Sequence, residues 1–198
     1  MGIEDFWPLV VFAVVSTITP GGATTLATAS GAHFGFRRSV PLLGGIATGL
    51  ASMAAAAAAG LAGLLLAAPS LQIAMRAVGS AYLLWLAWKI GRSGPPSLRA
   101  DLATPTSFAG GAWMLWQNPK GWAMTVGGAA SFAGLTSGPA RLAGLLGLTF
   151  GVAAAASLSI WCMVGKLLAR MLRTDGQWRA LNAVLAILLV VSIVPMWL

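Results

Sequence analysis

Charged side chains are scarce in this chain of 198 residues. Only 8% of the residues are charged, 58% are hydrophobic, and the mean hydropathy is +0.85. A soluble domain is typically about one quarter charged, so twelve basic and four acidic side chains could not cover a soluble surface of this size. The composition therefore excludes an ordinary soluble domain and predicts a small polytopic membrane protein without a separate soluble domain.

Cysteine, histidine and carboxylates are also nearly absent. The single cysteine, Cys162, cannot form an intramolecular disulfide, which argues against a thiol–disulfide carrier. The single histidine, His33, cannot build a histidine-rich metal site alone. All four acidic residues lie at chain ends or in expected loops, so the spans offer no carboxylate to a metal ion. We expect no metal and no cofactor, with His33 in a solvated loop and Cys162 in a helix contact.

Six predominantly apolar runs are present, and we interpret each as a transmembrane helix, since a span needs about 20 apolar residues. Glu4 and Asp5 precede the first run, whereas a cleavable signal opens with basic residues, so we interpret this run as a retained span. We expect one transmembrane domain over residues 1–198. The runs cover about residues 6–31, 40–66, 71–88, 108–132, 142–164 and 181–196.

The basic residues predict the orientation of the chain. Nine of the twelve follow the first, third or fifth run, and Lys and Arg are held on the cytoplasmic side of a membrane. The chain is therefore expected in a bacterial cytoplasmic (inner) membrane with both termini on the extracytoplasmic side. The net charge of +8 is then a topology signal, and we expect no nucleic-acid partner.

Two proline motifs lie half a chain apart. Thr19-Pro20-Gly21-Gly22 interrupts the first run, and Asn118-Pro119-Lys120-Gly121 interrupts the fourth. Proline inside a helix removes a hydrogen-bond donor and clashes with the preceding turn. Three spans per half require the second half to be inverted, and inverted repeats with broken helices are typical of secondary transporters. A simple proline kink is the alternative for either motif.

The predicted fold class is thus an all-α integral membrane protein. Its six transmembrane helices form an inverted three-plus-three repeat in which helices 1 and 4 are broken. We expect repeat 1 at about 1–92, a cytoplasmic connector at about 91–105 and repeat 2 at about 106–198.

Lys120 is the only ionisable side chain deep inside an expected span. A charge at that depth costs at least about 2.5 kcal/mol and usually faces the bundle interior or a water-filled cavity. Its ammonium group could meet a substrate carboxylate, could bind carbonyls freed by Pro119, or could do both. The predicted substrate-binding or gating residues are Thr19, Pro20, Gly21, Gly22, Gln117, Asn118, Pro119 and Lys120, with hydroxyl neighbours Thr17, Thr24, Thr25 and Thr125. The predicted helix-packing residues are Gly45, Gly49, Gly147 and Gly151, in G-x-x-x-G-like spacings.

Taken together, these motifs resemble the LysE/RhtB family of amino-acid exporters. The resemblance rests on Ile18-Thr19-Pro20-Gly21, on the glycine-rich stretch 44–49, on the G-x-x-Y-L stretch within 79–89 and on Asn118-Pro119-Lys120. Gly22 departs from the family's second proline, and 122–127 departs from its Phe-rich run. The resemblance implies a secondary transporter, not an enzyme, that exports amino acids or related small metabolites from the cytoplasm with proton coupling, as a homodimer in the membrane lipid.

Two further expectations concern substrate and mechanism. A lysine without an intramembrane carboxylate favours a zwitterionic or anionic amino acid as the small-molecule substrate, and alternating access around the paired breaks would carry it across. Two alternatives remain open. One is an exporter of a different solute such as a metal ion. The other is a non-transporting membrane assembly protein, an alternative that rests on Gly22 standing where the family has its second proline.

Overall fold

The computed structural model describes residues 6–61, 69–92, 106–194 and 197. All regular elements in these ranges are helices, which confirms the all-α expectation for this part of the chain. Most of the expected connector lies outside the described residues. The α-helices are α1 Trp7–Ile18, α2 Gly22–Ala56, α4 Pro69–Gly91, α5 Phe108–Trp116, α6 Pro119–Ser131, α7 Pro139–Met171 and α8 Asp175–Val191, and the short elements are the π-helix η2 Ala57–Leu61 and the 3₁₀ helix η3 Ala133–Leu135.

Helix α2 joins two of the expected spans through a sharp kink. Gly35 adopts φ 73° and ψ 172°, a left-handed conformation that glycine adopts without steric cost. The expected loop after the first span is therefore wrong: Arg37 and Arg38 lie on α2, just beyond the kink, and are exposed. The residues of α2 before Gly35 belong to the first expected span, and those after it belong to the second.

The lengths of the helices bear on how the chain could cross a bilayer. Two helical stretches, Gly22–Gly60 and Pro139–Met171, are long and apolar enough to span by length and composition. Helices α1, α5 and α6 have 12, 9 and 13 residues, and at about 1.5 Å per residue none alone covers a hydrocarbon core of about 30 Å. The six-span interpretation therefore requires α1 to cross together with the first part of α2, and α5 to cross together with α6.

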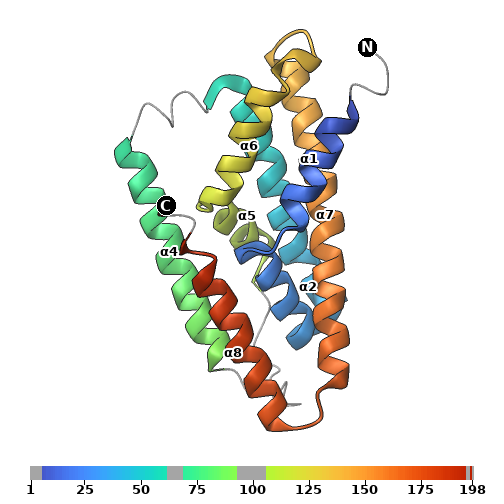
Figure 1. Cartoon of the computed structure of the whole chain (residues 1–198), viewed down its shortest axis with the longest axis vertical. Helices are drawn as coiled ribbons and strands as arrows, with labels where there is room; N and C mark the ends of the chain where they lie inside the picture. The colour runs from blue at the N-terminus through green and yellow to red at the C-terminus, as the bar shows by residue number, and fades with distance from the viewer. Residues whose placement is uncertain (1–5, 62–68, 93–105, 195–196, 198) are drawn as a thin grey trace.

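The helices form a main bundle and an attached pair (Figure 1). Helices α1, α2, α5, α6 and α7 make up the bundle, in which α2 and α7 share the most extensive contact. Helices α4 and α8 pack on each other along one side of it. Leu42, Met53, Leu146 and Phe150 are among the fully buried core side chains. Many outward Val, Leu and Ile side chains are exposed, as expected for helices that face lipid.

The four glycines predicted to pack helices all lie at helix contacts. Gly45 and Gly49 face α5, whereas Gly147 and Gly151 face α2. A Cβ atom added at any of these positions would lie between 2.0 and 3.2 Å from an atom of the neighbouring helix. Glycine at these points lets the helix backbones approach closely.

An equally close approach occurs where sequence analysis did not predict one. A Cβ atom at Gly31 of α2 would lie 2.0 Å from the carbonyl oxygen of Cys162, and one at Gly165 of α7 would lie 1.9 Å from the carbonyl oxygen of Thr28. The contact is reciprocal. Thr28 lies three residues before Gly31 on α2, and Cys162 lies three residues before Gly165 on α7, so each helix places a glycine against the backbone of the other. This reciprocal contact holds the first part of α2 against the second half of α7.

Candidate functional site

The first helix interruption lies at Thr19–Gly21. Helix α1 ends at Ile18 and α2 begins at Gly22. Pro20 has no N–H to donate to the carbonyl of Ser16 one turn earlier, so the helix cannot continue unchanged. Gly21 is extended, and its N–H donates to the Thr24 hydroxyl at 2.8 Å. The hydroxyl therefore satisfies a donor at the start of α2, where no helical carbonyl is available.

Helix α7 supplies donors to the carbonyls that this interruption frees. The Ser157 hydroxyl donates to the Thr17 carbonyl at 2.8 Å, and the Trp161 indole N–H donates to the Ile18 carbonyl at 3.1 Å. Ser157 and Trp161 are four residues apart and so lie on one face of α7. These two side chains hold the end of α1 in place, and sequence analysis did not single them out for this role.

The second interruption lies between α5 and α6 and has its own local caps. Asn118 is the N-cap of α6, and its side-chain oxygen accepts from the Lys120 backbone N–H at 3.0 Å. Pro119 occupies the first turn of α6, where its missing N–H costs nothing. The Trp122 indole donates to the carbonyl of Trp116, the last residue of α5, at 2.9 Å. The Asn-Pro pair therefore stops one helix and starts the next.

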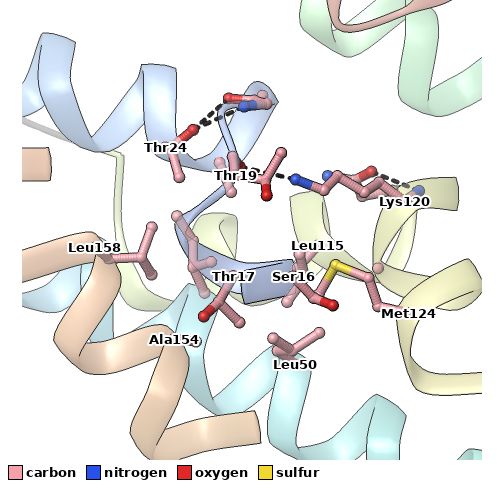
Figure 2. Close-up of a pocket in the computed structure, with 16 residues that line it drawn as sticks. Ser16, Thr17, Thr19, Thr24, Leu50, Leu115, Lys120, Met124, Ala154 and Leu158 are labelled. Carbon is pink, nitrogen blue, oxygen red and sulfur yellow. Dashed lines mark hydrogen bonds between the residues drawn. The ribbon is translucent and has the colours of Figure 1, made fainter. Parts of the chain in front are cut away.

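Lys120 connects the two interruptions. Its ammonium Nζ donates to the Thr19 carbonyl oxygen at 2.8 Å, across 101 residues of sequence (Figure 2). The carbonyl that Lys120 contacts was freed by the opposite motif, not by Pro119. Asp175, at the start of α8, is the only acidic residue in the described ranges and does not line the pocket at this site.

A pocket lies beside this contact (Figure 2). Its empty volume is about 420 Å³, part of it open to the outside, and small-molecule sites typically measure about 300–1,000 Å³. The end of α1, the start of α2 and the α5–α6 break provide polar lining, while α2, α5, α6 and α7 provide an apolar wall. The polar side chains are Ser16, Thr17, Thr19, Thr24, Asn118 and Lys120, and the larger apolar ones are Ile46, Leu50, Leu115, Met124 and Leu158.

The structure brings most of the predicted site residues to this pocket. Thr19, Gly21, Gly22, Asn118 and Lys120 line it. Pro20, Gln117 and Pro119 adjoin these residues in sequence without lining it, and Thr25 and Thr125 are buried. Sequence analysis missed the apolar wall, because Leu50 and Leu158 look like any other core leucines until the fold places them around one space.

His33 differs from its expected position. It is not in a solvated loop, because α2 continues through it to the kink at Gly35. The ring is half-buried, its Nε2 lies 2.8 Å from the side-chain oxygen of Asn182, and its centroid lies 5.5 Å from that of Trp178. Asn182 is fully buried. His33 thus joins the main bundle to α8.

Metal-binding residue types do not gather in the described part of the chain. No group of three or more His, Cys, Asp or Glu residues lies close enough there to hold a metal ion. Cys162 is buried at the contact with Gly31. The chemistry of the pocket therefore comes from one ammonium group, several hydroxyls and backbone carbonyls.

Comparison with known proteins gives a consistent result along nearly the whole chain. The family model described as LysE type translocator matches residues 14–193. A cysteine/O-acetylserine efflux protein of Escherichia coli O1:K1 / APEC is 30% identical over 191 residues, which cover 95% of this chain and 93% of the relative. Proteins of the same name from Escherichia coli strain K12 and Shigella flexneri are each 29% identical over 190 residues, with the same coverage. No solved structure matches.

Proposed function

The chain belongs to the LysE type translocator family, and from this premise we propose that it exports amino acids from the cytoplasm across the bacterial inner membrane. The observation that carries the proposal is the pocket at which two interrupted helices meet. There, Lys120 of one half donates to the Thr19 carbonyl of the other at 2.8 Å. Interrupted helices are where secondary transporters bind their substrates.

The substrate class follows from the charges in the pocket. Lys120 is half-buried and can pair with a carboxylate, and such a charge-assisted hydrogen bond is stronger than one between neutral groups. No acidic side chain among the described residues lines the pocket, so a lysine-like or arginine-like side chain would find no carboxylate partner there. We therefore favour neutral zwitterionic amino acids, with small side chains against Leu50, Met124 and Leu158.

The relatives indicate which substrates to test first. They are named for efflux of cysteine and O-acetylserine, and both compounds are neutral zwitterions with short side chains. These two amino acids fit the proposed class, and the departures at Gly22 and residues 122–127 leave room for a different preference within it.

The orientation proposed from the basic residues is consistent with the arrangement of the helices. Figure 1 shows the kink of α2, the C-terminal end of α4 and the turn between α7 and α8 at one end of the molecule, with the start of α1 at the other. Arg37, Lys89 and Arg170 lie near that first end, which is therefore the cytoplasmic one.

Alternating access and proton coupling complete the proposed mechanism. The pocket would open in turn to each side as one half of the chain rocks against the other. Export against a gradient needs an energy source, and the proton gradient across the inner membrane can supply it. A protonophore collapses the proton gradient, so adding it to preloaded cells should stop export while labelled amino acid is still present inside them.

An efflux assay on a matched set of variants tests the function. Cells preloaded with labelled cysteine, O-acetylserine, glutamate or lysine are compared for the wild type, Lys120→Met and Lys166→Met at equal membrane expression. We expect the wild type to export the neutral amino acids and Lys120→Met to lose about tenfold or more in rate, since one charge-assisted bond is worth about 1.5–3 kcal/mol. Lys166→Met removes a lysine that does not line the pocket and should keep the wild-type rate.

Three results would count against the proposal. Absence of export of any labelled amino acid by the wild type would reject the exporter. Export of lysine without any export of neutral amino acids would reject the substrate class. Equal rates for Lys120→Met and the wild type would leave the exporter in place but reject the carboxylate contact.

A further inference from the structure

The end of α1 offers backbone oxygen to a cation. Its last carbonyls have no helical partners, and the C-terminal end of a helix carries partial negative charge. Ser157 and Trp161 donate to the Thr17 and Ile18 carbonyls from α7. The Thr19 carbonyl instead accepts from the Lys120 ammonium group. The pocket thus presents a carbonyl that is occupied by a cation belonging to the chain itself.

Lys120 can leave this position without unfolding either helix end. Its backbone is fixed at the start of α6 by Asn118, and the start of α2 is capped by Thr24. Neither cap uses the ammonium group. A Cβ atom at Gly21 would lie 3.4 Å from Nζ, an ordinary van der Waals contact, so the ammonium group lies directly beside the start of α2 without a steric clash. The side chain itself is long, flexible and half-buried.

We propose that the Thr19 carbonyl at the end of α1 is an ammonium-binding subsite, which Lys120 fills in the absence of substrate and which the α-ammonium group of an amino acid takes over during transport. The released Lys120 then donates to the carboxylate of the same amino acid. This inference rests on the proposed function and adds how both charged groups of the substrate are recognised.

The exchange has a physical advantage and a selective consequence. One primary ammonium group replaces another, so the helix end keeps a charged donor in both states. A carboxylate compound whose amino group is acylated cannot make the replacement, because its amide nitrogen carries no positive charge and keeps only one N–H donor in place of three. The subsite therefore selects free amino acids over their N-acyl derivatives.

The first test measures binding and needs no transport. Purified full-length Lys120→Met is titrated with ethylammonium chloride, and its unfolding temperature is followed, because a ligand that binds the folded state stabilises it. We expect ethylammonium to bind Lys120→Met about tenfold or more tightly than the wild type, whose subsite is already filled, in line with the strength of hydrogen bonds to charged groups. Tetramethylammonium carries the same charge without an N–H donor and should have no such effect.

Arg141→Met provides the matched control variant. It removes one exposed cation that lies far along α7 from the pocket lining and should respond to ethylammonium as the wild type does. Equal stabilisation of Lys120→Met and the wild type would overturn the proposal, as would equal effects of ethylammonium and tetramethylammonium. If Lys120→Met does not unfold cooperatively, Lys120→Gln takes its place in the same titration.

A second test uses the wild type alone. Unlabelled cysteine and N-acetylcysteine compete with labelled cysteine for uptake into inside-out vesicles, whose outer face is the cytoplasmic one, and we expect the acetylated compound to compete at least about tenfold more weakly. Equal competition would overturn the subsite while leaving the exporter intact. If the wild type exports no amino acid, the exporter fails, and the ethylammonium titration still decides whether the end of α1 binds an ammonium group.

Discussion

The contact between α2 and α7 gives a direct stability prediction for Gly165→Ala. The added methyl carbon would lie 1.9 Å from the Thr28 carbonyl oxygen, and real Cβ atoms essentially never approach a heavy atom closer than 3.0 Å. The two backbones must therefore separate locally by about 1.1 Å, the difference between these distances. The obstacle is backbone rather than a flexible side chain, so a rotamer change cannot relieve the clash.

The magnitude follows from two opposing terms. Overpacking a closely packed contact costs about 1–3 kcal/mol, occasionally more. Alanine recovers up to about 1 kcal/mol through its higher helix propensity. We expect a net loss, and for a chain of this size each kcal/mol lowers the unfolding temperature by roughly 2–4 °C.

The single cysteine provides the assay. Cys162 is fully buried at this contact, one turn before Gly165, and no other thiol is present. During heating, a fluorogenic maleimide should label Cys162 faster in Gly165→Ala than in the wild type. The midpoint of the thermal unfolding that this labelling reports should be several degrees lower. Gly144→Ala is the control, because a Cβ atom at Gly144 on the same helix meets nothing within 4 Å. Equal midpoints and labelling rates for the two variants would refute the packing argument.

Three further predictions concern the site and its surroundings. Trp161→Phe keeps an aromatic ring but leaves the Ile18 carbonyl without its donor, so the maximal efflux rate should fall several-fold at equal expression, and an unchanged rate would exclude a positioning role. Gly22→Pro should fold and export like the wild type, because Gly22 begins α2 and proline is tolerated in the first helical turn. The midpoint of thermal unfolding and the efflux rate measure these two properties. Alanine substitutions of His33 and Asn182 should each lower the midpoint of thermal unfolding. In a double-mutant cycle their effects on the free energy of unfolding should couple by about 0.5–3 kcal/mol. Additive effects would mean that the 2.8 Å contact between the two side chains contributes nothing to stability.

The helix interruptions could be located from the sequence because their causes are local. Pro20 lacks a donor wherever it is placed, and Asn118 before Pro119 is a helix-start pattern that needs no tertiary contact. The same rules did not anticipate that helical structure runs up to Gly35 on both sides, with only a kink at this residue between residues 33 and 38. Gly35 adopts positive φ, and the helix resumes directly after this kink, so a stretch that looked like a basic loop became part of α2.

Which helix interruption contacts which side chain depends on tertiary structure, so local sequence rules could not predict it. A lysine side chain is long enough to reach its own helix break or a neighbouring one, and the sequence does not distinguish these outcomes. The structure places Lys120 on the Thr19 carbonyl, while Ser157 and Trp161 cover the two carbonyls before it. The donors to the Thr17, Ile18 and Thr19 carbonyls therefore all come from the second half of the chain. The first interruption is thus an incomplete site by itself, and the pocket exists only where the two halves meet.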